Sequence, residues 1–151
     1  MKKSEVAAAQ AAVRAQLAKA GIAVSPETPV EIADFGLGHY PVEGLGLVVK
    51  INEPEYCSKW MTLLPGQECP THYHKDKKET FFVLDGKVEI KLPDEVVTLG
   101  PGQSYTLVPG VAHSFRSEGG AVIEEVSTHD ENADSYFANA AVLRDPLVEE
   151  G

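Results

Sequence analysis

The sequence has few of the residues that define several common classes of protein. Only 2 cysteines, Cys57 and Cys69, occur among its 151 residues, too few for a disulfide scaffold or for a metal site built from thiolates. No apolar run approaches the roughly 18 residues that a membrane-spanning helix needs. The amino terminus has no uninterrupted apolar centre of the signal-peptide kind. These absences predict a reduced, cytoplasmic protein with no membrane association.

Positive charge is also scarce. Lys and Arg number 13 against 23 Asp and Glu, which gives a formal net charge of -10. A surface this negative repels nucleic-acid phosphates and anionic membranes, so neither is an expected partner. The hydrophobic share of 43% is ordinary for a soluble globular chain. The length suits one domain with a single core.

The chain begins with the one helix that the pattern clearly predicts, over residues 4–20. Ser4 is a favourable N-cap residue, and apolar residues repeat at helical spacing along one side: Val6, Ala9, Val13 and Leu17. Two prolines within residues 25–29 then separate this helix from the rest of the chain. We expect the helix to pack on the domain or to form an oligomer contact.

From about residue 30 onward, short β-rich runs alternate with glycine and proline. They cover residues 45–51, 58–64, 80–84, 87–92, 95–99, 104–108, 114–116 and 121–126. Many short strands at this spacing predict an all-β antiparallel sandwich or barrel. We expect one domain over residues 1–151, with helix and linker in residues 1–29, a barrel in residues 30–130 and a tail in residues 131–151. The tail from Tyr136 is expected to return as a short helix or strand.

The strongest functional pattern is His72-x-His74-x4-Glu79. In a strand, residues i and i+2 point to the same face, so the two imidazoles can aim at one point. If residues 75–78 form a hairpin loop, His74 lies opposite Glu79 and His72 opposite Phe81. Directly opposed residues have Cβ atoms about 5 Å apart. The pattern therefore predicts two imidazoles and a carboxylate on the inner face of one hairpin.

His113 follows a turn that opens another strand, and it is a further candidate ligand. For each histidine the alternative is an ordinary surface or hydrogen-bonded residue. Imidazole and carboxylate ligands without thiolate suit Mn²⁺, Fe²⁺, Co²⁺ or Zn²⁺.

The spacing of these residues resembles that of the cupin superfamily. Gly66-x5-His72-x-His74-x4-Glu79-x6-Gly86 resembles the first cupin motif at every position, and Gly102 followed by Gly110-x2-His113 resembles the second. Val108 and Ser117 depart from the second motif without affecting a ligand. The resemblance implies a cupin β-barrel of jelly-roll type with one divalent metal ion, Mn²⁺ by preference, held by His72, His74, Glu79 and His113.

A narrower resemblance runs nearly from end to end of the chain. Asp34-Phe35-Gly36-Leu37-Gly38, Leu64-Pro65-Gly66-Gln67-x-Cys69-Pro70-x-His72-Tyr73-His74, Glu125-Val126-Ser127 and Leu143-Arg144-x-Pro146 fall in the order of the D-lyxose isomerase family, of which this is a short form. The resemblance implies a homodimeric sugar isomerase that converts D-lyxose to D-xylulose and D-mannose to D-fructose. Thr80 replaces the family's usual Asp, and residues 138–142 contain no acid where longer members are expected to carry a catalytic one.

Two residues are candidates for moving protons during such a reaction. Lys77 matches the position of the family's lysine, and its alternative is a solvated run with Lys75 and Lys78. Glu125 joins the cavity if alternate residues of its strand face inward; its alternative is an exposed acidic pair with Glu124.

Two other functions stay open at this point. Non-haem iron oxygenases of the cupin type commonly bind metal through two histidines and one carboxylate. A cupin can also bind a sugar or a metal without catalysis, because one fold carries many functions. Trp60 is expected in the core or at the mouth of the barrel.

Overall fold

The computed structural model describes residues 1–144. Within these residues one helix is followed by eleven short strands and a single 3₁₀ turn, so the predicted all-β fold with an N-terminal helix is confirmed. The elements are α1 (Lys3–Lys19), β1 (Glu31–Ala33), β2 (Leu45–Asn52), β3 (Cys57–Leu63), β4 (Gln67–Tyr73), β5 (Glu79–Gly86), β6 (Val88–Lys91), β7 (Val96–Leu99), β8 (Ser104–Leu107), β9 (His113–Ser117), β10 (Ala121–Ser127), η1 (Asn132–Asp134) and β11 (Tyr136–Phe137). Within the described part of the chain, no helix combines the length and apolar character needed to cross a membrane.

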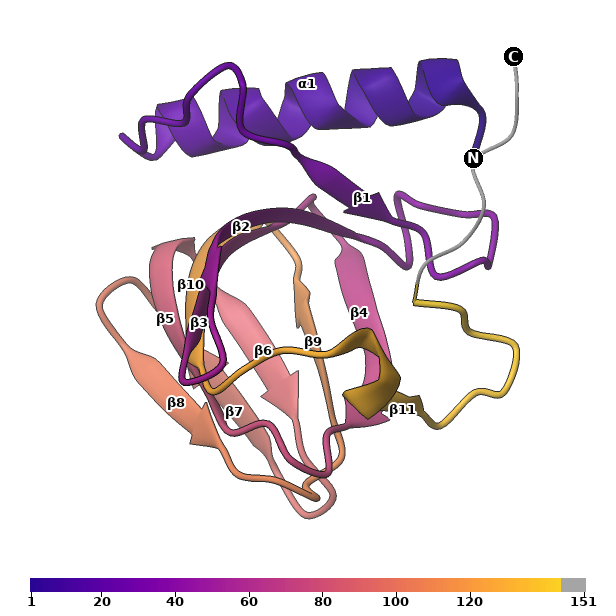
Figure 1. The fold of residues 1–151 in the computed structure, drawn as a ribbon, viewed down its shortest axis with the longest axis vertical. Helices are drawn as coiled ribbons and strands as arrows, with labels where there is room; N and C mark the ends of the chain where they lie inside the picture. Colours follow the sequence, from indigo (N-terminus) through magenta and orange to yellow (C-terminus); the bar gives the residue numbers. More distant parts are fainter. Residues whose placement is uncertain (145–151) are drawn as a thin grey trace.

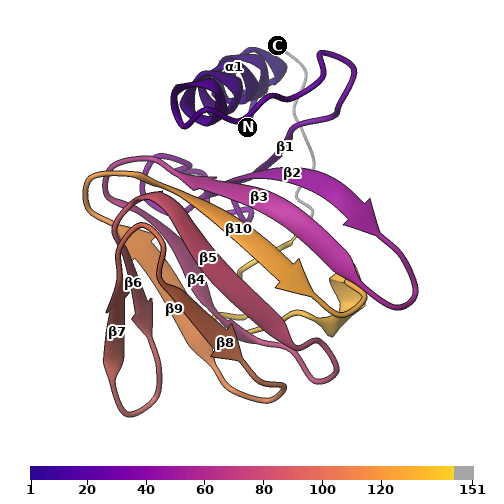
Figure 2. The same cartoon turned by 90° about the vertical axis from the view of Figure 1, so that its left-hand side faces the viewer.

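The strands form two antiparallel sheets that pack face to face (Figures 1 and 2). One sheet has the order β1-β2-β3-β10-β5-β8, and the other has the order β11-β4-β9-β6-β7. Alternate side chains of both sheets point into a shared core that includes Phe81 and Ile123 from the first sheet and Ile90 and Phe115 from the second. The fold is therefore a flattened barrel with an interior lined by both sheets.

Helix α1 lies outside this barrel, above β1, β2 and β3 (Figure 2). Val13 and Leu17 pack against Val48 and Val122 in a second apolar cluster. A Cβ atom at Gly46 would overlap Val13, so glycine at this position lets the helix rest directly on β2. Burying side chains of this size contributes roughly 1.5–3 kcal/mol each, which fixes the helix to the sheet.

The expected N-cap was wrong, and of the two positions expected for Trp60 the structure shows the packed one. The helix begins at Lys3 with Lys2 at the N-cap, and the Lys2 backbone N–H donates to Glu5 Oε2 at 2.7 Å, so Ser4 lies within the first turn. Trp60 does not line the barrel mouth, because its neighbours Lys59 and Met61 take the inward positions of β3. Its ring packs instead on the helix-side cluster, with Lys50 Nζ 4.7 Å from the ring centroid.

The predicted hairpin of residues 72–81 was also wrong. Strand β4 pairs with β9 and β11, whereas β5 pairs with β10 and β8, so residues 74–78 cross from one sheet to the other. His72 lies opposite His113, not opposite Phe81. Inward-facing side chains of two packed sheets also meet, across an interior about 10 Å thick. Alternation alone therefore cannot tell a hairpin from a crossing between sheets.

The tail contributes to the second sheet. Tyr136–Phe137 form β11, which pairs with the end of β4 at Tyr73 and His72. Residues 145–151 of the predicted tail lie outside the described residues. The division into residues 1–29, 30–130 and 131–151 stays a prediction.

Candidate functional site

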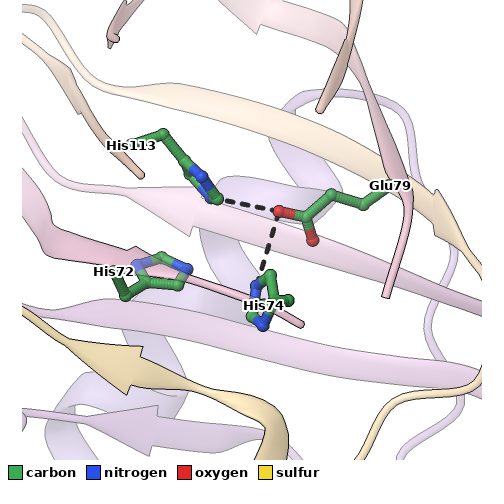
Figure 3. Close-up of side chains that lie close together, drawn as sticks. All are labelled: His72, His74, Glu79 and His113. Atoms are coloured by element: carbon green, nitrogen blue, oxygen red, sulfur yellow. Dashed lines mark ion pairs between the residues drawn. The ribbon is translucent and has the colours of Figure 1, made fainter. Parts of the chain in front are cut away.

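Four buried side chains converge at one end of the barrel interior (Figure 3). They are the predicted ligands His72, His74, Glu79 and His113, and the ligand atoms they offer all lie within 4.8 Å of one another. The two sheets contribute them from the end of β4, the start of β5 and the start of β9. The structure thus brings together all four residues, although it does so across the barrel.

The main chain orients each imidazole. Each ring places Nδ1 on a backbone carbonyl oxygen: His72 on Pro70 at 2.8 Å, His74 on Asp134 at 2.9 Å and His113 on Val111 at 3.0 Å. A carbonyl oxygen can only accept, so Nδ1 carries the proton and Nε2 of a neutral ring presents a lone pair. Burial, together with the nearby His113, lowers the pKa of His72 to about 3, which keeps that ring neutral.

The two oxygens of the Glu79 carboxylate contact different partners. Oε1 lies 3.1 Å from His113 Nε2 and 3.6 Å from His74 Nε2, while Oε2 lies 3.0 Å from Lys77 Nζ. Among residues 1–144, Glu79 Oε1 and His113 Nε2 are buried without a hydrogen-bond partner. Burial would raise the pKa of the Glu79 carboxyl, but the Lys77 ammonium is the largest of several influences that hold it well below its usual range.

This donor set fits a divalent metal ion. Lone pairs on neutral imidazole nitrogens and a carboxylate oxygen face one another in a buried place, where without a cation they only repel. Backbone carbonyls that fix the second nitrogen of each histidine are typical of metal-binding imidazoles. The arrangement contains no thiolate, which favours Mn²⁺, Fe²⁺, Co²⁺ or Zn²⁺ over metals that prefer sulfur.

The loop between β4 and β5 turns one lysine inward. Lys75 and Lys78 are exposed, as the solvated-run alternative expected, but Lys77 is only 4% exposed. The carboxylate of Asp134 accepts the backbone N–H groups of residues 75, 76 and 77 at 2.9–3.2 Å, and so shapes the loop. Burial would lower the pKa of Lys77, but the surrounding carboxylates, with Glu125 the strongest, raise it above its ordinary value.

Glu125 also faces the interior. It lies on β10 opposite Phe81, with its Oε1 atom 3.6 Å from Lys77 Nζ. Burial, followed by the negative charge of Glu79, raises the pKa of Glu125 to about 8. Its neighbour Glu124 points outward and pairs with Lys50 at 2.7 Å. The alternative of an exposed acidic pair is therefore wrong for Glu125 and right for Glu124.

A cavity of about 330 Å³ connects these groups, within the range of pockets that hold small molecules. Its charged wall carries His72, His74, Lys77, Glu79 and Glu125, and its apolar wall includes Met61, Phe81 and Phe115. Three of the four predicted metal ligands, His72, His74 and Glu79, therefore line the same cavity as both predicted proton-handling residues.

Three more charged residues lie beside this cavity that were not predicted to belong to the site. Lys59 and Arg144 line it, and Asp130 pairs with both of them at 2.7 Å and 2.8 Å. The inward position of Lys59 could have been predicted from the sequence, because Lys59 alternates with Cys57 and Met61 on the inward side of its strand. Asp130 and Arg144 follow the last long strand, where no periodic pattern marks them.

Comparison with known proteins agrees with this geometry. Residues 59–127 match the cupin domain family (Cupin_2). Over 180 residues the chain is 34% identical to the D-lyxose/D-mannose isomerase of Thermosediminibacter oceani, covering 99% of each chain. It is 35% identical to the D-lyxose ketol-isomerase of Cohnella laeviribosi over 161 residues, covering 87% of this chain and 88% of that one. The chain belongs to the D-lyxose ketol-isomerase family of cupins.

Solved structures share the fold. The L-ribose isomerase of Cellulomonas parahominis with L-psicose superposes with a TM-score of 0.82 at 19% identity, covering 93% of this chain and 94% of that one. The L-ribose isomerase of Geodermatophilus obscurus gives a TM-score of 0.82 at 20% identity with the same coverage. At this identity the likeness establishes the barrel architecture.

Proposed function

We propose that the protein is a metal-dependent aldose–ketose isomerase that interconverts D-lyxose with D-xylulose and D-mannose with D-fructose. The observation that carries the proposal is the buried pair Lys77 and Glu125, placed beside a three-histidine, one-carboxylate group in a cavity of about 330 Å³. Relatives that align along most of the chain are named D-lyxose/D-mannose isomerase and D-lyxose ketol-isomerase. The L-ribose isomerase structures of the same fold include complexes with L-ribose and L-psicose.

The proposed metal ligands are His72, His74, Glu79 and His113. Their neutral nitrogens and one carboxylate oxygen suit Mn²⁺, with Co²⁺, Fe²⁺ and Zn²⁺ as further candidates. A divalent ion bound there supplies positive charge that polarises the sugar carbonyl.

The chain's own groups would then move the proton between C1 and C2. A carboxylate with a pKa of about 8 is matched to accepting and returning a proton near neutral pH, so we assign this role to Glu125. The Lys77 ammonium lies 3.6 Å from Glu125 Oε1, where it can stabilise negative charge that develops on a sugar oxygen.

The test is to incubate purified protein with D-lyxose, D-mannose, L-ribose and other aldoses, and to measure ketose formation. We expect turnover of D-lyxose and D-mannose that is lost in chelator and restored by Mn²⁺. Oxygen uptake, measured in parallel, would identify an oxygenase. Carbon-bound deuterium from D₂O should appear at C1 of the ketose if Glu125 takes the proton from C2 and delivers one to C1, and a ketose without carbon-bound deuterium would favour a hydride shift. Undiminished turnover by a verified metal-free preparation would refute the metal-dependent mechanism.

The proposal extends to the state of the protein in the cell. We expect a homodimer, as the family resemblance implies, and a cytoplasmic location. The two cysteines, Cys57 and Cys69, are buried free thiols, which suits a reducing compartment. Light scattering after size exclusion tests the dimer, and a monomer at micromolar concentration would contradict it.

A further inference from the structure

One buried carboxylate outside the proposed catalytic pair forms ion pairs with three cationic side chains. Asp130, just beyond β10, is 8% exposed. Its Oδ1 atom lies 3.0 Å from Lys77 Nζ, and its Oδ2 atom lies 2.7 Å from Lys59 Nζ and 2.8 Å from Arg144 Nη2. The three cations come from the loop before β5, from β3 and from the tail, so Asp130 joins three separate segments.

Asp130 stands behind the cavity wall. Lys59, Lys77 and Arg144 all line the cavity, whereas Asp130 is absent from its lining. Three positive groups that line the same cavity repel one another unless an anion lies between them. The carboxylate of Asp130 occupies that position without itself facing the place where a sugar would bind.

Two hydrogen bonds with the Asn52 side chain fix the backbone of Asp130. Asn52 Nδ2 donates to the Asp130 carbonyl oxygen at 3.0 Å, and the Asp130 N–H donates to Asn52 Oδ1 at 3.1 Å. Burial would raise the pKa of Asp130, but Lys77, Lys59 and Arg144 hold it far below its ordinary value. The carboxylate is therefore a charged and fixed partner for the three cations.

The position of Lys77 matters for the metal ligands. Its Nζ atom lies 3.0 Å from Asp130 Oδ1 and 3.0 Å from Glu79 Oε2. Glu79 keeps its other oxygen, Oε1, toward the imidazoles. If Asp130 lost its charge, the ammonium would have only Glu79 and Glu125 as anionic partners, and both its attraction to Glu79 and its competition with a metal ion would increase.

We propose that Asp130 is a positioning residue. It holds the Lys77 ammonium beside Oε2 of Glu79 and fixes the positions of the three cations that line the cavity. Its effect on catalysis rests on the proposed isomerase function. Its effect on metal affinity does not, because that affinity is measured on the purified protein without substrate. The two consequences can therefore fail separately.

The test combines Asp130→Asn with Lys77→Met. In competition with a chromogenic chelator, Asp130→Asn should weaken Co²⁺ binding about 10-fold, the lower end of the effect of residues that support metal ligands. Lys77→Met should bind Co²⁺ at least as tightly as the original protein. The double variant should match Lys77→Met alone, because Asp130 acts through Lys77. In turnover, Asp130→Asn should lower kcat on the order of 10-fold or more with a smaller change in KM, and its addition to Lys77→Met should cost nothing further.

Asp94→Asn is the matched control, since it removes the same charge from an exposed turn and should change neither measurement. Should Asp130→Asn not fold, Asn52→Ala loosens Asp130 from an exposed position and should weaken Co²⁺ binding several-fold, again only when Lys77 is present. Unchanged Co²⁺ affinity in the Asp130 or Asn52 variant, or losses that add to those of Lys77→Met, would overturn the proposal. If Co²⁺ binding depends on Asp130 and Lys77 in this way but no aldose is isomerised, the proposed function fails and the positioning role stands.

Discussion

The two ends of the barrel interior differ although the same strands build both. On β10, Ile123 lies in the apolar core and Glu125, two residues later, lies in the cavity. On the neighbouring β3, Met61 and Lys59 repeat this change in the same register. Each pair occupies successive inward positions of one strand. The apolar part of the interior therefore gives way to the charged part at the same position along both strands.

This difference separates stability from chemistry. At the apolar end, every buried side chain contributes roughly 25 cal/mol per Å² removed from water. At the charged end, burial costs free energy unless each charge finds a partner, which the pairing of Lys77 with Glu79 and Asp130 provides. Substitutions at one end should therefore reduce mainly stability, and those at the other mainly metal binding and turnover.

The largest effect is expected from removing a metal ligand. His74→Ala should lose most bound metal and nearly all turnover, because it deletes one of four ligand atoms at the charged end. His39→Ala is the control, since His39 is exposed and pairs with Glu43. Elemental analysis beside the ketose assay measures both quantities. Full metal occupancy in His74→Ala would show that the ligand group is misassigned.

Lys77→Met should leave metal content nearly unchanged and lower kcat on the order of 10²–10³-fold, the usual cost of removing a group that stabilises developing negative charge. Methionine keeps an unbranched side chain but has no charge and no donor. Lys78→Met, one position along the same loop and exposed, should be as active as the original enzyme. Equal activity of the two variants would show that the Lys77 ammonium does not stabilise the transition state.

A substitution at the apolar end should give the opposite result. Ile123→Ala should lower the free energy of unfolding by roughly 2–5 kcal/mol, as large-to-small changes in cores do. Its kcat at low temperature should stay within about twofold, because the cavity wall at Glu125 is unchanged. Val126→Ala on the exposed side of the same strand should cost only about 0.5 kcal/mol. Urea denaturation measures the unfolding free energy of both variants. A large loss of kcat in folded Ile123→Ala would contradict the separation of stability from chemistry between the two ends.

The smallest effect concerns acid stability. The pKa of Asp130 is lower in the folded protein than its ordinary value of 3.8. The contribution of its charge to the free energy of unfolding is therefore fully present above about pH 4 and is lost as the pH falls through the folded-state pKa. The difference in unfolding free energy between the original protein and Asp130→Asn should therefore shrink below pH 4. Denaturation of both metal-free proteins between pH 3 and pH 7 checks this. A difference that is constant over the range would mean that charge is not what Asp130 contributes.

The sequence was sufficient for some features and not for others. Spacing identified the four candidate ligands and the barrel, because period-two patterns and glycine turns are local signals. It did not determine which strands pair, since His74 and Glu79 can meet within a hairpin or across two sheets. The place of Asp130 and Arg144 beside the cavity could not be predicted for a related reason, because it depends on how the chain after β10 folds back over the barrel. The motif Leu143-Arg144-x-Pro146 marked Arg144 only as part of the family resemblance.

The hydrogen bonds from the three imidazoles to backbone carbonyls have an evolutionary consequence. A carbonyl oxygen is present whatever side chain its residue carries, so replacing the side chain of Val111 leaves the acceptor for His113 in place. Ring orientation is thereby insulated from drift in the side chains around it. A lineage can alter the walls that touch the sugar, and with them the preferred substrate, while inheriting the same metal-binding geometry.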